Sequence, residues 1–191
     1  MGEKRSIIFV CLGNTCRSPL AEVIFRSVFN STGPHTMIDD PDTEAVVSCS
    51  SAGAFAKSEQ PYSSDSVRIA KSMYKEDISR GYTHIAIYER LIEHDIVICM
   101  TDQIADFLRN RFEELQDRIF SFSELLEKYG IKGVDGNVED PYGHEFSVYM
   151  DTAKQIEDII RALMPCLLKS WGMNCSCLLS VCFLIDVDFF P

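Results

Sequence analysis

An apolar run at residues 7–10, IIFV, restricts the fold of this chain more than any other feature of its sequence. Every position of the run is apolar, so the strand that it predicts must be buried on both faces. The polar loop 11–17 follows it, and the helical pattern SPLAEVIFRSVFNST comes directly after the loop. A fully buried strand followed by a loop and a helix is typical of a parallel sheet covered by helices.

Strand and helix patterns continue to alternate along the chain. Further strands are expected from Ala45 to about Ser50, in DIVICM from Asp95, and at the start of RIFSFSELLEKYG. Helical spacing recurs in SSDSVRIAKSMYKE, THIAIYERLIEHD, TDQIADFLRNRFEEL and FSVYMDTAKQIEDIIRALMPCLL, the last ending near Pro165. These patterns predict a single-domain α/β fold, with a central four-stranded parallel sheet and helices on both faces.

Two helix starts can be assigned from their capping residues. Ser18 is expected at the N-cap of the first helix with Pro19 at its first position, and Thr101 caps the helix after DIVICM. The loop 11–17 then lies at the carboxyl end of the first strand, where open α/β sheets bind their ligands. We therefore expect a phosphate-binding loop directly after the first strand.

The C-terminal residues differ in composition from the rest of the chain. We expect one domain over residues 1–168 and an atypical apolar, cysteine-rich tail over residues 169–191. The tail has no charge between residues 170 and 185, but this run is too short and too interrupted to predict a membrane span. Its cysteines leave open an unstructured extension, membrane association through acylation, or docking onto a partner.

Charge and cysteine content exclude several classes of protein. A formal net charge of −11 over 191 residues argues against nucleic-acid binding, which needs a basic surface. The apolar run near the N-terminus is too short for a signal peptide, so we expect a cytoplasmic protein whose eight cysteines are mostly reduced. Cys11 and Cys16 have no second pair of ligands at a suitable spacing, so we expect no metal site.

The loop 11–17 combines a nucleophile with groups that bind an anion. Cys11 directly follows the strand, and backbone N–H groups at the start of the next helix favour an oxyanion or a thiolate. Gly13 and Asn14 allow the backbone to turn these groups inward, and the planar guanidinium of Arg17 can bind two phosphate oxygens. The alternative is a buried structural cysteine with a surface arginine, but the strand before and the helix after favour a site.

Phosphoryl transfer to a thiolate also needs an acid for the leaving group and a base for water. Asp140, in VEDPYG, is the candidate for both roles. The alternative is an aspartate that only stabilises a turn, since Asp-Pro is common in turns.

VCLGNTCRSPLAE and EDPYG together resemble the two signature motifs of the low-molecular-weight protein tyrosine phosphatases. The resemblance covers roughly residues 6–168. It implies hydrolysis of phosphotyrosine and small aryl phosphates through a cysteinyl-phosphate intermediate, without a cofactor and with phosphorylated proteins as substrates. It also implies Cys11 as the nucleophile, Arg17 as a phosphate-binding residue, and Asp140 as the general acid and then base.

The resemblance assigns further residues to the site. A supporting hydrogen-bond network of Asn14, Ser18, Ser51 and His84 is implied, although His84 is equally explained as a surface or core histidine. The loop residues that it implies for phosphate binding are Leu12, Gly13, Asn14, Thr15, Cys16, Arg17 and Ser18.

Three positions depart from the usual family pattern. Phe55 and Lys57 stand near the place of an aromatic wall of the cleft, and Tyr142 is followed by glycine where many relatives have a second aromatic residue. Thr15 stands where many tyrosine phosphatases of the family have an aliphatic residue and the related protein-arginine phosphatases have threonine. A phosphoarginine phosphatase is therefore one alternative function, and a phosphopeptide-binding module with little turnover is another.

Cys16 lies on the same tight loop as Cys11. Peroxide converts an exposed thiolate into a sulfenic acid, which a neighbouring thiol captures as a disulfide. We therefore predict that oxidation reversibly inactivates the site through a Cys11–Cys16 disulfide.

Overall fold

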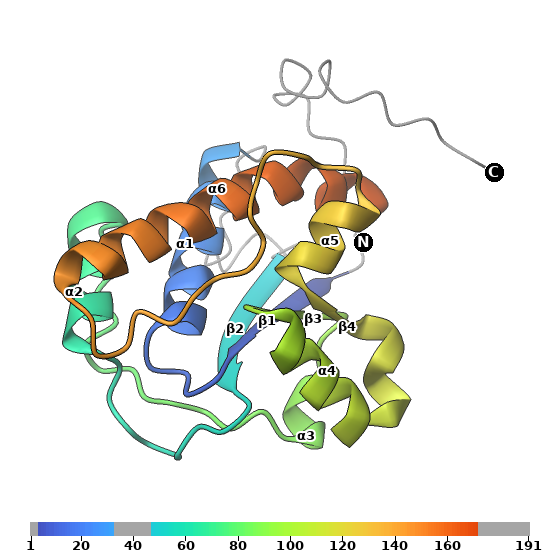
Figure 1. The fold of residues 1–191 in the computed structure, drawn as a ribbon, viewed down its shortest axis with the longest axis horizontal. Helices are drawn as coiled ribbons and strands as arrows, with labels where there is room; N and C mark the ends of the chain where they lie inside the picture. Colours follow the sequence, from blue (N-terminus) through green and yellow to red (C-terminus); the bar gives the residue numbers. More distant parts are fainter. Residues whose placement is uncertain (1–3, 33–46, 172–191) are drawn as a thin grey trace.

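The computed structural model describes residues 4–32 and 47–171. Its four strands are all parallel and lie in the order β2-β1-β3-β4 (Figure 1). The predicted α/β fold with a four-stranded parallel sheet is therefore confirmed. The strands are β1 (Arg5–Cys11), β2 (Val47–Gly53), β3 (Ile96–Cys99) and β4 (Ile119–Ser121).

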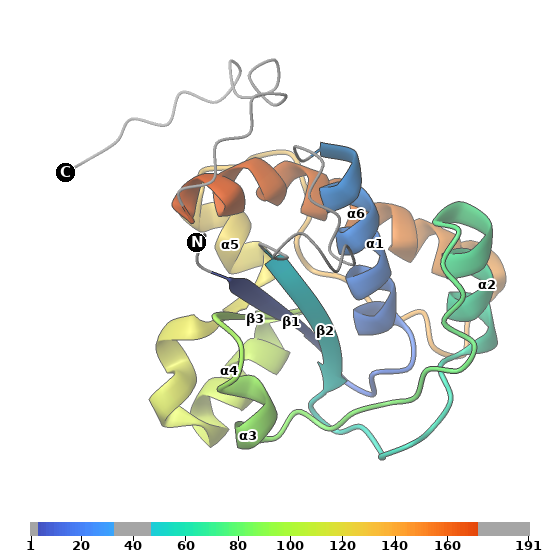
Figure 2. The same cartoon turned by 180° about the vertical axis from the view of Figure 1, so that it is seen from behind.

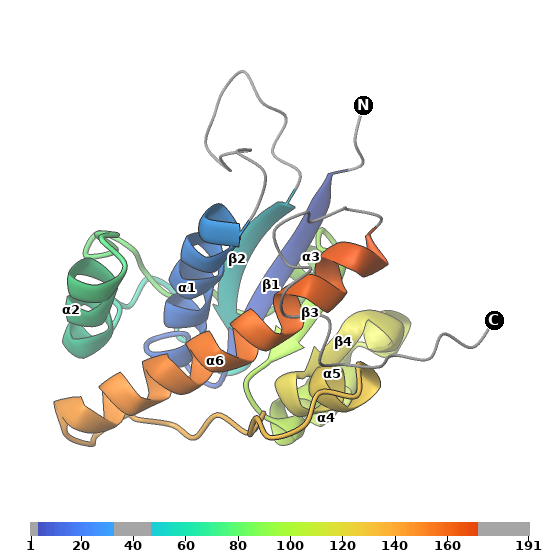
Figure 3. The ribbon, with the colours of Figure 1, turned by 90° about the horizontal axis from the view of Figure 1, so that it is seen from above.

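Helices cover both faces of this sheet. Figures 1 and 2 show the strands between α1 and α6 on one side and α3 and α4 on the other, and Figure 3 shows α6 running across the molecule. Phe9 of β1 packs on Phe25 of α1 and Phe122 of α5, with ring centroids 5.7 and 6.1 Å apart. The helices are α1 (Arg17–Thr32), α2 (Ser64–Met73), α3 (Tyr88–Leu91), α4 (Asp102–Arg111), the 3-10 helix η1 (Glu113–Arg118), α5 (Phe122–Lys128) and α6 (Phe146–Ser170).

The start of α1 differs from the sequence prediction. The helix begins at Arg17, so the prediction that Ser18 is its N-cap is wrong. The Ser18 hydroxyl instead contacts the Cys11 sulfur and the Ala52 carbonyl, both at 3.0 Å. The cap predicted for α4 is confirmed, because the Thr101 hydroxyl accepts a hydrogen bond from the N–H of Ile104.

The end of α6 also differs from the prediction, since the helix continues through Pro165 to Ser170. A proline inside a helix costs about 3 kcal/mol because it removes one backbone hydrogen bond and crowds the preceding turn. Leu167 and Leu168 lie beyond it and are almost completely buried, and their burial offsets this cost. The boundary expected at residue 168 stays a prediction, and most of the predicted tail, residues 172–191, lies outside the described part of the chain.

Gly53, the last residue of β2, lets the loop after β1 lie directly against the sheet edge. A Cβ atom at this position would lie 2.7 Å from the backbone nitrogen of Asn14 and 2.9 Å from the carbonyl oxygen of Leu12. Only glycine accommodates so close an approach without a shift of the loop. Within residues 4–32 and 47–171, no helix is both long and apolar enough to cross a bilayer.

Candidate active site

Cys11 lies at the carboxyl end of β1 and is 2% exposed. Its sulfur accepts hydrogen bonds from the backbone N–H of Asn14 at 3.1 Å and from the hydroxyl of Ser18 at 3.0 Å. Two donors on one sulfur suit an anionic nucleophile, since hydrogen bonds to a charged acceptor are stronger than neutral ones.

Asn14 shapes the loop around this sulfur. Its φ of 56° lies in the left-handed region, which turns its N–H toward Cys11. Its buried side chain donates to the Ser18 hydroxyl at 2.9 Å and accepts from the backbone N–H of His84 at 2.8 Å. The structure thus brings together three of the four residues expected in the supporting network.

His84 and Ser51 differ from that expectation in their contacts. His84 joins the network through its backbone, while its imidazole packs edge-on against Tyr82. Burial and the positive charge of Arg90 lower the pKa of this imidazole. Ser51 is buried beside Phe9 in the sheet, and its hydroxyl has no hydrogen-bond partner among the described residues, so no described contact joins it to the loop.

Arg17 connects the loop with the distant acid. It is 4% exposed and donates to the carbonyl of Val138 at 2.9 Å and to the carboxylate of Asp140 at 2.5 Å. Its buried Nε–H has no partner among the described residues. An arginine held by two of its nitrogens, with a third donor unpaired, is well suited to bind an oxyanion.

Asp140 is partly exposed, at 38% of its side chain. One carboxylate oxygen accepts from Arg17, and the other accepts the backbone N–H of Tyr142 at 3.2 Å. This carboxylate therefore faces both the loop and the solvent, as an acid and base for substrate and water must.

The residues expected in the substrate cleft lie at the surface. Phe55 is tied to the loop because its N–H donates to the Leu12 carbonyl at 2.8 Å, and its ring lies 4.5 Å from that of Phe107. Leu12, Phe55 and Tyr142 are exposed at 47%, 58% and 71%. Lys57 is also exposed, and its backbone carbonyl accepts from the hydroxyl of Thr83.

The outer side of the loop contacts α2 and α6. The sulfur of Cys16 lies 3.4 Å from the hydroxyl of Thr15 and 3.5 Å from that of Tyr149, and burial and Cys16 together raise the pKa of Tyr149. The Thr15 carbonyl accepts from the N–H of Ser63 at 2.9 Å. Sequence reasoning missed Tyr149 and the Val138 carbonyl, because each lies over 100 residues from its partner and neither belongs to a motif.

In residues 4–32 and 47–171, no three His, Cys, Asp or Glu side chains lie close enough together to hold a metal ion. The arrangement around Cys11 consists of a sulfur with two donors, a buried arginine and a carboxylate. These groups match the requirements of nucleophilic attack on a phosphoryl group, stabilisation of its charge, and proton transfer.

Comparisons with known proteins match nearly the whole chain. The family model for low molecular weight phosphotyrosine protein phosphatase matches residues 6–172. A protein-arginine-phosphatase of Bacillus subtilis is 30% identical over 164 residues, covering 85% of this chain and 97% of the relative. The low molecular weight protein-tyrosine-phosphatase PtpB of Staphylococcus epidermidis is 31% identical over 154 residues, covering 81% and 93%. The crystal structure of a low molecular weight protein tyrosine phosphatase from T. tengcongensis superposes with a TM-score of 0.69 at 33% identity, covering 85% and 99%.

Proposed function

This chain belongs to the low molecular weight phosphotyrosine protein phosphatase family, and we propose that it hydrolyses phosphotyrosine in proteins, and small aryl phosphates, through a cysteinyl-phosphate intermediate. The observation that carries this proposal is the ion pair between Asp140 and Arg17, the residue directly before the Ser18 whose hydroxyl donates to the Cys11 sulfur. A module that only bound phosphopeptides would need the arginine but not the acid.

In the first step, the Cys11 thiolate attacks phosphorus, so that an S–P bond forms while the P–O bond to the aryl group breaks. Protonated Asp140 gives its proton to the departing oxygen. Arg17 and the amides of the loop stabilise the negative charge on the remaining phosphoryl oxygens. The product of this step is the free phenol and a phosphorylated Cys11.

In the second step, water attacks the same phosphorus and the S–P bond breaks. The Asp140 carboxylate, left ionised by the first step, takes the proton of the water. Inorganic phosphate leaves, and the Cys11 thiolate and the protonated Asp140 are restored. The cycle consumes one water and needs no metal or redox cofactor.

Aryl phosphate hydrolysis tests this mechanism. Freshly reduced wild type should hydrolyse p-nitrophenyl phosphate, and Cys11→Ser should lose at least ~10³-fold in kcat because its hydroxyl is a much weaker nucleophile. Cys49→Ser, a cysteine in β2, is the matched control and should keep most activity. Wild type that binds a phosphotyrosine peptide without turning over any aryl phosphate would instead identify a binding module.

A second candidate substrate is phosphoarginine, because Thr15 places a hydroxyl in the loop and a curated relative is a protein-arginine-phosphatase. If phosphotyrosine is the substrate, wild type should have the higher kcat/KM on a phosphotyrosine peptide, and Thr15→Ile should keep or raise it. A strong preference of wild type for phosphoarginine that Thr15→Ile abolishes would replace phosphotyrosine with phosphoarginine.

We also place this activity in the cytoplasm, acting on phosphorylated proteins. The proposed nucleophile must stay a free thiol, and Cys11, Cys16, Cys49 and Cys99 form no disulfide in the structure. Cytoplasmic conditions keep such thiols reduced.

A further inference from the structure

The segment that carries Asp140 has no regular secondary structure of its own. It runs from the end of α5 at Lys128 to the start of α6 at Phe146, and Figures 1 and 3 show it passing beside α6. The position of Asp140 therefore depends on a few individual contacts of this loop with the rest of the fold.

Two of these contacts lie close to Asp140 along the chain. Gly136 passes directly over the start of α5, because a Cβ atom there would lie 2.5 Å from the backbone nitrogen of Ser123. Val138 is completely buried, its N–H donates to the Met100 carbonyl at 3.0 Å, and its carbonyl accepts from Arg17. These contacts hold the loop against α5 and against the end of β3.

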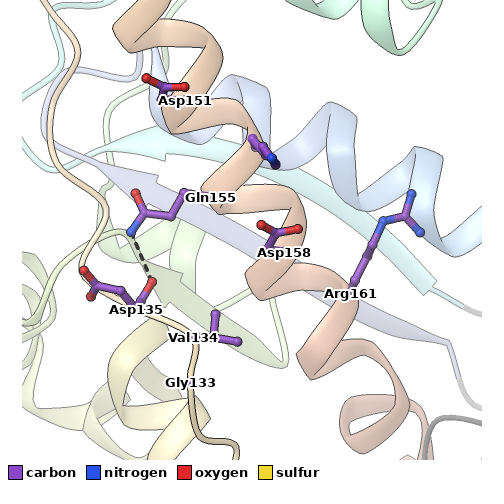
Figure 4. A pocket seen from close by; sticks show the side chains of 8 residues that line it. Gly133, Val134, Asp135, Asp151, Gln155, Asp158 and Arg161 are labelled. Carbon is purple, nitrogen blue, oxygen red and sulfur yellow. Dashed lines mark hydrogen bonds between the residues drawn. The ribbon is translucent and has the colours of Figure 1, made fainter.

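The third contact comes from α6. The side-chain amide of Gln155 donates from its Nε2 to the backbone carbonyls of Asp135 and Asn137, both at 3.1 Å. Figure 4 shows Gln155 reaching from the helix to Asp135 across a groove. One amide thus holds the carbonyls on both sides of Gly136, and Asp140 follows Asn137 by only three residues.

Two other residues that line this groove provide matched control variants. The groove has a volume of about 540 Å³, and Lys154 and Asp158 of α6 line it together with Gln155. Both are exposed, charged and on the same helix. A variant at either position changes the charge of the groove while leaving the two hydrogen bonds of Gln155 in place.

We propose that Gln155 is a positioning residue for the general acid. By bonding the carbonyls of Asp135 and Asn137 it holds the loop where Asp140 meets both Arg17 and the leaving group of the substrate. This inference rests on the proposed phosphatase function. In this role Gln155 does not contact the substrate, and it acts only by fixing the position of the Asp140 carboxyl group.

The test compares two substrates that depend differently on an acid. Phenyl phosphate has a basic leaving group that needs protonation, whereas p-nitrophenyl phosphate has a good leaving group that needs little. Gln155→Met and Gln155→Glu keep the approximate size of the side chain but lack the N–H donors. Each should lower kcat/KM for phenyl phosphate by roughly three- to tenfold, which is the effect of losing one or two ordinary hydrogen bonds. The fold-change in kcat/KM for p-nitrophenyl phosphate should be less than half as large.

Three further variants separate a loss of positioning from general damage to the protein. Gln155→Lys, whose ammonium can again donate to the two carbonyls, should restore most of the activity on phenyl phosphate. Lys154→Gln and Asp158→Asn should leave both substrates within about twofold of wild type. Thermal melting of each variant checks that the fold is intact. If the added charge of Gln155→Glu unfolds the protein, the comparison relies on Gln155→Met alone.

A double-mutant cycle with Asp140→Asn decides the matter. Once the acid is absent, its position is irrelevant, so Gln155→Met should cause no further loss on phenyl phosphate in that background. Equal losses in both backgrounds, or equal losses on both substrates, would overturn the inference while leaving the proposed function intact. If Asp140→Asn alone does not reduce phenyl phosphate turnover selectively, the acid role of Asp140 fails, and the inference fails with it.

Discussion

Asn14 combines an unfavourable backbone conformation with several favourable contacts. Its φ of 56° costs about 1–2 kcal/mol for a residue with a Cβ atom, although asparagine tolerates this region better than most. In return, its N–H reaches the Cys11 sulfur and its side chain joins Ser18 to the backbone of His84. A single residue therefore links β1, the start of α1 and the segment before α3.

Substitution of Asn14 separates these two effects. Asn14→Ala keeps the strain and loses both side-chain bonds, so it should lower the free energy of unfolding by about 2–3 kcal/mol. Asn14→Gly also loses the bonds but relieves the strain, and should be about 1 kcal/mol more stable than Asn14→Ala. Urea denaturation measures both values, and kcat/KM should fall at least about tenfold in each variant. Wild-type activity in Asn14→Ala would show that the network does not shape the loop.

At the scale of elements, the turn from β4 into α5 supports the loop that carries Asp140. Ser121 caps α5, and Glu124 completes a capping box by accepting the Ser121 N–H at 2.8 Å. Arg109 of α4 donates to both oxygens of the same carboxylate, at 2.7 and 2.9 Å. The start of α5, over which Gly136 passes, is thus held by a charged group as well as by packing.

This carboxylate makes part of the stability depend on pH. The hydrogen bonds from Arg109 are the main cause that lowers the pKa of Glu124 below its ordinary value, and burial partly opposes them. A lowered pKa in the folded state means that the stabilisation is complete above the ordinary value and is lost as the pH falls through the lowered one. The structure therefore predicts that the contact between α4 and α5 contributes to the free energy of unfolding at neutral pH and that this contribution is lost in acid.

Glu124→Gln tests this prediction, because the amide cannot titrate. The variant should be less stable than wild type at neutral pH, and its stability should change less than that of wild type from about pH 6 to about pH 3. Glu127→Gln, on the exposed side of α5, is the control and should follow the wild-type pH profile. If urea denaturation gave the same pH dependence of the free energy of unfolding for Glu124→Gln and wild type, Glu124 would not be the source of this acid sensitivity.

At the scale of the whole molecule, the site is assembled from the two ends of the described fold. Arg17 contacts Val138 and Asp140, which lie 121 and 123 residues further along the chain. The sheet makes this possible, since the loop after β1 and the Met100 segment after β3 lie at the same edge and Val138 bonds to Met100. A protein with a formal net charge of −11 thus keeps a buried arginine at the site where the proposed mechanism binds a phosphate group.

Much of this arrangement could be predicted from the sequence, because it is expressed in short patterns. Buried strands such as 7–10 are apolar at every position. The loop motif and EDPYG can each be recognised because each is an uninterrupted stretch of sequence. The end of α6 could not be predicted, because burial of Leu167 and Leu168 outweighs the local effect of Pro165. The contacts of Val138, Tyr149 and Gln155 could not be predicted from the sequence either, since each depends on how separate segments of the chain pack together.

The phosphorylated intermediate itself can be detected by trapping the phosphoryl group on the enzyme. Wild type and Asp140→Asn, which should hydrolyse the intermediate slowly, are mixed with p-nitrophenyl phosphate, denatured rapidly in alkali, in which the S–P bond survives, and examined by mass spectrometry. The cysteinyl-phosphate mechanism predicts one phosphoryl group on the peptide that contains Cys11, more of it in Asp140→Asn, and none in Cys11→Ala. A phosphoryl group on another residue, or turnover by wild type with no phosphorylated enzyme in either protein, would contradict it.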